Sequence, residues 1–213
     1  MKFPIQTITP YVHGWLQAKL PQEAIDHLWD CINTARGERW NSHLAGHIDS
    51  SFKLEDKNDW FWKNVLQQLT NEYGKRFDHS HSSIIVKSKH LNPYLDTLWM
   101  NCSKQHEFNP VHDHDGLYSF VVWMKIPTYH DKQNQLDNAK DVKRALNSTF
   151  QFNYINTLGN IKSTTYAMNP DKEGTMVFFP ARLNHSVNPF YNCDEQRISI
   201  AGNICLRDMR VTP

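Results

Sequence analysis

The spacing of apolar residues changes from helical to strand-like near residue 93. Apolar residues recur at helical spacing over 21–36 and 60–77, and we expect an amphipathic helix in each segment. For the first helix, Pro21 suits the first helical position and Gly37 suits the end. Asp59 is a candidate cap for the second helix. Residues 5–20 alternate loosely and predict a first strand and a turn. Residues 78–93 are polar and rich in histidine, with a candidate short strand at 84–86.

Beyond residue 93 the apolar residues occur in short runs that are typical of strands. The expected strands lie at 98–102, 118–126, 149–156, 161–167, 175–179 and 198–206. Several short strands in succession favour a mainly β fold, a sandwich or jelly roll. The polar segment 129–148 interrupts them, and we expect a surface excursion with one helical turn near 142–146 and a candidate lid.

Composition narrows the classes of protein. The chain has 213 residues, 39% hydrophobic and 12% aromatic, which favours a packed domain over a disordered chain. The net charge is +1 and no basic block occurs, so neither nucleic acid nor a membrane is an expected partner. The four cysteines form no CxxC pair, and we expect reduced thiols in a cytoplasmic protein.

Three histidines form a candidate metal site. Residues two apart on a strand point to the same side, so His112 and His114 face one way and Asp113 the other. His185 follows an expected strand bounded by Gly174 and Pro180, which would bring it to a strand end. Three imidazoles on one side of an octahedral ion leave three open positions, the layout of non-heme Fe(II) oxygenases. Imidazole is not selective, so nickel, zinc or manganese remain alternatives.

The same residues carry a family resemblance. The run Asn109-Pro-Val-His112-Asp-His114-Asp-Gly116 is followed by Ser119-Phe-Val-Val-Trp123, with Trp99-Met-Asn101 upstream and 174–199 downstream. In these motifs the chain closely resembles the Fe(II)/2-oxoglutarate-dependent oxygenase superfamily, in particular prolyl 4-hydroxylase-like members of phages and bacteria. The resemblance spans roughly residues 97–206. It implies a double-stranded β-helix (jelly roll, cupin-like) at 94–213, packed against a helical support region at 1–93 in a single domain, 1–213.

The resemblance also implies Fe(II) and 2-oxoglutarate as cofactors. The family's usual motif is His-x-Asp or His-x-Glu, and here the third position is His114. Either the site has three histidine ligands, which strand alternation favours, or Asp113 or Asp115 turns in and supplies a carboxylate. In the first case a nearby carboxylate is free to orient an imidazole N–H.

The Arg-x-Ser motif of the family matches Arg197 and Ser199, which would hold the distal carboxylate of 2-oxoglutarate. A guanidinium grips a carboxylate through two parallel N–H donors. Asn101 and Tyr118 are weaker candidates for the same pocket. We expect Trp99 and Trp123 to belong to the core.

The function that the resemblance implies is hydroxylation of a C–H bond coupled to oxidative decarboxylation of 2-oxoglutarate, which yields succinate and CO2. Besides O2, the partner would be a small-molecule or peptidyl substrate, with a prolyl residue as the first candidate, and 129–148 and the N-terminal segment would form the substrate wall. Two alternatives remain. One is a three-histidine, cupin-type dioxygenase that does not use 2-oxoglutarate, which Arg197 and Ser199 disfavour. The other is a non-catalytic binding module on the same fold.

Overall fold

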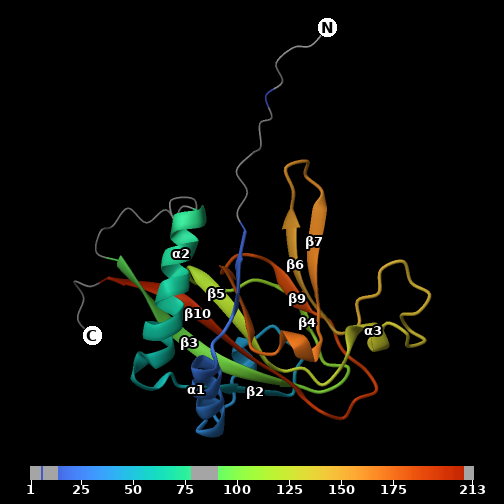
Figure 1. Ribbon diagram of the computed structural model, residues 1–213, viewed down its shortest axis with the longest axis horizontal. Helices are drawn as coiled ribbons and strands as arrows, with labels where there is room; N and C mark the ends of the chain where they lie inside the picture. Colours follow the sequence, from blue (N-terminus) through green and yellow to red (C-terminus); the bar gives the residue numbers. More distant parts are fainter. Residues whose placement is uncertain (1–5, 7–13, 78–90, 209–213) are drawn as a thin grey trace.

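The computed structural model of the chain describes residue 6, residues 14–77 and residues 91–208 (Figure 1). The strand expected within 5–20 is present as β1, Leu16–Lys19. The remainder of that expectation, at residues 5 and 7–13, and the short strand expected at 84–86 lie outside the described residues.

The two helices that the apolar spacing predicts are present, with different ends: the first, α1, stops at Asn33, before Gly37. The helices are α1, Gln22–Asn33; a π-helix, Trp62–Leu66, that continues into α2, Gln67–Phe77; α3, His130–Gln133; and 3-10 helices at Asn41–His43, Lys57–Asp59 and Pro170–Lys172. Pro21 is the residue before α1 rather than its first helical residue. Asp56, and not Asp59, caps the second helix, because its carboxylate accepts from the backbone N–H groups of Phe61 and Trp62 at 2.8 and 2.9 Å.

The strands form two antiparallel sheets. Besides β1 they are β2, Ser50–Lys53; β3, Leu91–Ser103; β4, Asn109–His112; β5, Tyr118–Lys125; β6, Thr149–Ile155; β7, Ile161–Ala167; β8, Thr175–Pro180; β9, His185–Val187; and β10, Arg197–Asp208. One sheet has the order β1-β8-β5-β10-β3-β2 and the other β4-β9-β6-β7. The predicted mainly β jelly-roll fold with N-terminal helices is confirmed.

Side-chain alternation along β5 and β8 divides the interior into two layers. Phe120, Val122 and Phe178 face α1 and α2, which cover the six-stranded sheet (Figure 1). Their strand neighbours Trp123 and Phe179 point the other way and pack with residues of the four-stranded sheet. The second layer ends at the strands that carry the histidines, so the candidate site lies between the sheets.

The polar excursion 129–148 differs from its expectation. Its helical turn is α3, at the beginning of the segment, and no helix occurs over 142–146. Gln133 anchors α3, because its side-chain amide donates to the Tyr191 carbonyl and accepts from the Tyr191 N–H, both at 2.8 Å. No helix in the described part of the chain has the length and apolar character needed to span a membrane.

Candidate metal and co-substrate site

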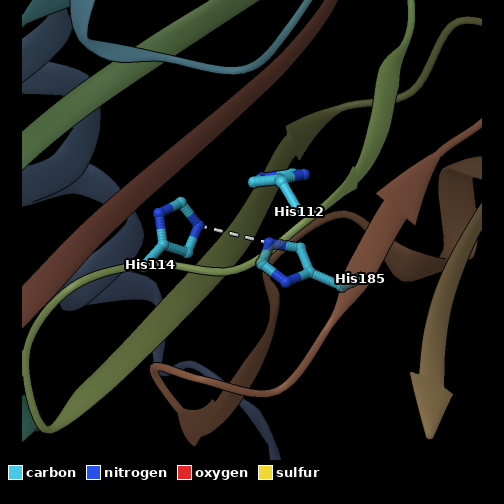
Figure 2. Close-up of side chains that lie close together, drawn as sticks. All are labelled: His112, His114 and His185. Carbon is cyan, nitrogen blue, oxygen red and sulfur yellow. Dashed lines mark hydrogen bonds between the residues drawn. The ribbon is translucent and has the colours of Figure 1, made fainter.

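Strand pairing brings the first two histidines together. β4 ends at His112 and β9 begins at His185, and the two residues are direct partners in the antiparallel register. His114 follows β4 by two residues, where its backbone N–H donates to the Ala181 carbonyl at 2.9 Å. The three side chains point toward one another from these segments (Figure 2).

Backbone carbonyl groups orient two of the rings. His112 Nδ1 lies 2.8 Å from the Pro110 carbonyl oxygen, and His185 Nδ1 lies 2.9 Å from that of Leu183. A carbonyl oxygen only accepts, so each Nδ1 carries the proton and each Nε2 keeps its lone pair. Donation of one ring N–H to a carbonyl in this way fixes the tautomer that binds a metal through the other nitrogen.

The distances between the rings suit one ion. The three candidate ligand atoms all lie within 4.8 Å of one another, and His114 Nε2 is 3.2 Å from His185 Nε2. Two nitrogens bound at a right angle, each about 2.1 Å from an ion, lie roughly 3 Å apart. Among the described residues, these three histidines form the group that could hold a metal.

Burial keeps the cluster neutral. Desolvation, with a smaller contribution from the neighbouring His112, lowers the pKa of His114 to about 4. The pKa of His112 is lowered by burial, and that of His185 is well below its usual value through burial and the other two rings. Near neutral pH all three imidazoles are therefore unprotonated, which is the form that binds a metal.

The two carboxylates beside His114 point elsewhere. Asp113 Oδ2 lies 3.3 Å from Arg182 Nη1, and Asp115 Oδ1 lies 3.1 Å from Arg182 Nη2. Asp115 is exposed to solvent, whereas Asp113 still contributes to the edge of the cavity. The structure thus brings His114, rather than either aspartate, to the other two imidazoles.

Arg197 begins β10 and is buried, with 3% of its surface exposed. Its Nη1 donates to the Asn188 carbonyl at 3.2 Å and its guanidinium lies over the Phe190 ring, 5.1 Å from the centroid. Its Nη2 is buried and has no hydrogen-bond partner in the part of the chain that the structure describes. Desolvation lowers the pKa of Arg197 from 12.5 to about 10, and the charge of Glu107 acts in the opposite direction. A buried cation with a free donor is an incomplete anion site.

The other polar residues lie beside Arg197 in the register of β3 and β10. Ser103 pairs with Arg197, and Asn101 pairs with Ser199. The side-chain oxygen of Asn101, Oδ1, accepts a hydrogen bond from Ser51 Oγ at 2.6 Å, which fixes the orientation of the Asn101 amide. Arg197, Ser199, Asn101 and Ser103 all line the cavity of about 210 Å³ that the three histidines line.

Tyr118 is the predicted site residue that the structure does not bring to this cavity. It is fully buried in the layer that faces the helices, where its ring packs against Tyr73 and Phe178. Burial raises its pKa. Conversely, Trp99 and Trp123, expected in the core, are buried but also line the cavity.

Two groups of lining residues have no counterpart in the sequence analysis. Ser103 follows Trp99 and Asn101 at the same spacing of two, and extending the alternation along β3 would have found it. His43, Leu44, Ala45 and Ile48 form a wall from an irregular segment, whose sequence has no periodic signal. None of the lining residues of this cavity comes from 129–148. The substrate wall expected from that segment stays a prediction.

A jelly roll whose sheets enclose three converging imidazoles and a buried arginine defines a class of protein, the metal-dependent oxygenases that use a 2-oxo acid. The model of the 2OG-Fe(II) oxygenase family matches residues 97–203, half of the chain, and the chain belongs to this family. Membership implies Fe(II) and 2-oxoglutarate as cofactors. None of the curated proteins matches the chain.

Solved structures support the fold. A prolyl-4-hydroxylase from Pseudomonas putida is 12% identical, with a TM-score of 0.51 over 92% of this chain and 94% of that one. A prolyl hydroxylase from Trichoplax adhaerens, solved with a peptide fragment of the hypoxia inducible factor oxygen degradation domain, is 10% identical, with a TM-score of 0.50 over 93% and 85%. AviO1 from Streptomyces viridochromogenes Tue57 is 12% identical, with a TM-score of 0.51 over 95% and 93%.

Proposed function

We propose that the chain, as a single domain over 1–213, is an Fe(II)- and 2-oxoglutarate-dependent dioxygenase that hydroxylates a C–H bond and produces succinate and CO2. His112, His114 and His185 would hold the iron through Nε2, and Arg197 the distal carboxylate of 2-oxoglutarate, with Ser199 and Asn101 beside it. The observation that carries the proposal is the unpaired Nη2 of buried Arg197 in the cavity that the three imidazoles line.

Bound iron supplies the oxidation chemistry, since with 2-oxoglutarate it activates O2. The protein's own groups bind and orient. Because all three ligands are neutral imidazoles, nothing in the ligand set offsets the charge of a divalent ion, and a dianionic co-substrate is favoured. Apolar side chains of Ile48, Phe150 and Met168 line the same cavity and make that part of its wall apolar.

An uncharged group is the substrate that this cavity favours. Apart from the three histidines, the ionisable side chains on its wall are Arg197, assigned to the co-substrate; Asp113, paired with Arg182; and His43 at the exposed edge. Two of the neighbours in fold are prolyl hydroxylases, one of them solved with a peptide. A prolyl residue is therefore the first substrate to test, although fold likeness carries little weight for substrates.

The test is succinate formation by the purified protein with prolyl peptides and free proline. We expect succinate only when Fe(II), O2 and 2-oxoglutarate are all present, and none from His185→Ala. The matched control is His106→Ala, which removes an exposed histidine that does not line the cavity. His185→Ala protein that forms succinate at the wild-type rate would overturn the proposal. Metal and 2-oxoglutarate binding without turnover on any substrate would instead indicate a binding module.

A further inference from the structure

Trp99 has an unpaired hydrogen-bond donor beside the three histidines. It lies on β3 with 2% of its surface exposed, and it lines the cavity. Its ring centroid is 5.6 Å from that of His114. Its indole Nε1 is buried and has no partner among the described residues.

A buried N–H without an acceptor is rare in folded proteins, because the group loses water and gains nothing in return. The indole of Trp15 shows the usual arrangement, since its Nε1 donates to the Tyr166 hydroxyl at 2.8 Å. Trp99 is thus a second unpaired donor in the cavity, besides Arg197 Nη2. Two unpaired donors, together with the unpaired side-chain oxygen of Asn109 on the same cavity wall, indicate that a polar ligand with acceptor groups belongs in this cavity.

The register of β3 and β10 places Trp99 and Arg197 at opposite ends of one line of side chains. Trp99 pairs with Ala201, Asn101 with Ser199, and Ser103 with Arg197. At about 3.3 Å per residue, Trp99 and Ser103 are roughly 13 Å apart along the strand. The cavity that Trp99 and Arg197 both line lies along this span, and Ala201 on its wall is small. A five-carbon diacid is the ligand that the proposed function places there.

The depth of Trp99 favours the co-substrate over the substrate as its acceptor. The exposed edge of the cavity is formed by His43, Ala45 and Asp113, and a substrate would enter there. Trp99 is almost fully buried, as are Asn101 and Arg197. A ligand that already lies deep in the cavity is the one it can contact.

We propose that the Trp99 indole N–H donates a hydrogen bond to an oxygen of the 2-oxo acid group of 2-oxoglutarate, at the end of the co-substrate nearest the histidines. Trp99 is then a positioning residue that sets the orientation of this group, while Arg197 holds the other end. The inference rests on the proposed function, because it requires 2-oxoglutarate to bind in this cavity.

The test uses the protein loaded with Zn(II), which is diamagnetic and suits imidazole ligands. The chain has seven tryptophans. In the ¹⁵N-labelled protein we expect one indole N–H signal to move downfield on addition of 2-oxoglutarate, and this signal to be absent from Trp99→Phe. Trp123→Phe is the matched variant, because it removes the other indole on the cavity wall, and the moving signal must persist in it. This measurement on the wild-type protein holds even if Trp99→Phe fails to fold.

Binding constants separate the two ends of the ligand. Trp99→Phe should weaken the binding of 2-oxoglutarate by roughly tenfold, which is the effect of losing one hydrogen bond to a charged group. It should weaken 2-oxopentanoate, which has the same carbon chain without the distal carboxylate, by the same factor. Arg197→Met should weaken only 2-oxoglutarate.

The outcomes distinguish failure of the proposed function from failure of the Trp99 contact alone. If wild-type protein loaded with metal binds no 2-oxoglutarate, the proposed function and this inference both fail. If wild type binds it while no indole signal moves and Trp99→Phe binds equally well, the inference alone is overturned. A moving signal that is lost in Trp123→Phe would assign the contact to Trp123 and overturn it as well.

Discussion

Replacement of Arg197 by methionine should stabilise the protein without co-substrate and abolish its stabilisation by 2-oxoglutarate. The fall in the pKa of Arg197 from 12.5 to about 10 corresponds to roughly 3 kcal/mol against the charged form in the folded protein. Methionine loses the hydrogen bond to the Asn188 carbonyl, worth about 1 kcal/mol, and carries no charge. The net gain is then about 2 kcal/mol, in keeping with the replacement of other buried charges by apolar groups.

The assay is thermal unfolding of Mn(II)-loaded protein with and without 2-oxoglutarate. A ligand at 100 times its dissociation constant adds about 2.7 kcal/mol to the wild type, and for a chain of this length each kcal/mol raises Tm by about 2–4 °C. We expect a rise of roughly 5–10 °C in wild type and none in Arg197→Met. The matched control is Arg182→Met, an exposed arginine whose ion pairs are worth about 0–1 kcal/mol. Arg197→Met protein that melts below wild type and still responds to 2-oxoglutarate would show that the buried charge is not destabilising and does not hold the ligand.

Three further predictions concern metal binding, stability in acid and packing of the core. His114→Asp should keep Mn(II) binding while His114→Ala loses at least about tenfold in a competition titration, because only the aspartate still offers a ligand; equal binding by both would exclude position 114 from the site. The pKa of His114 is about 4 in the folded protein and near 6.5 in the unfolded chain, so on acidification the unfolded chain binds the proton first. The stability that is present above pH 6.5 is therefore lost as the pH falls toward 4. Urea unfolding of chelator-treated protein should show a loss of roughly 2 kcal/mol from this residue between pH 7 and 5, and a flat profile would contradict the burial of the cluster. Gly202→Ala should cost about 1–3 kcal/mol in urea unfolding, because its Cβ would lie 2.6 Å from Phe120 Cζ and 2.7 Å from the Thr97 carbonyl, and an unchanged midpoint would contradict this packing.

The strands and the relation of His112 to His114 could be predicted from sequence because both depend on local periodicity, whereas His185 reaches them through the pairing of β4 with β9. The expected strand at 161–167 matches β7, and those at 118–126 and 149–156 differ from β5 and β6 by one residue at one end. The same rule, that alternate residues share a face, placed His112 and His114 on one side.

Site residues were assigned wrongly where this alternation was not followed along the whole strand. Tyr118 and Trp123 are five apart on β5 and face opposite sides, so both could not reach the cavity. Trp99 is two residues from Asn101 and had to share its face. The wall at 43–48 and the position of the helical turn in 129–148 depend on tertiary contacts, such as that between Gln133 and Tyr191, which no local pattern encodes.

The decisive measurement for the metal and co-substrate site is a crystal structure of the protein with Mn(II) and 2-oxoglutarate bound. We expect the ion to be bonded to Nε2 of His112, His114 and His185, with the distal carboxylate of the ligand against Arg197. An ion bound through Asp113 or Asp115 instead of His114, or a ligand carboxylate away from Arg197, would contradict this expectation.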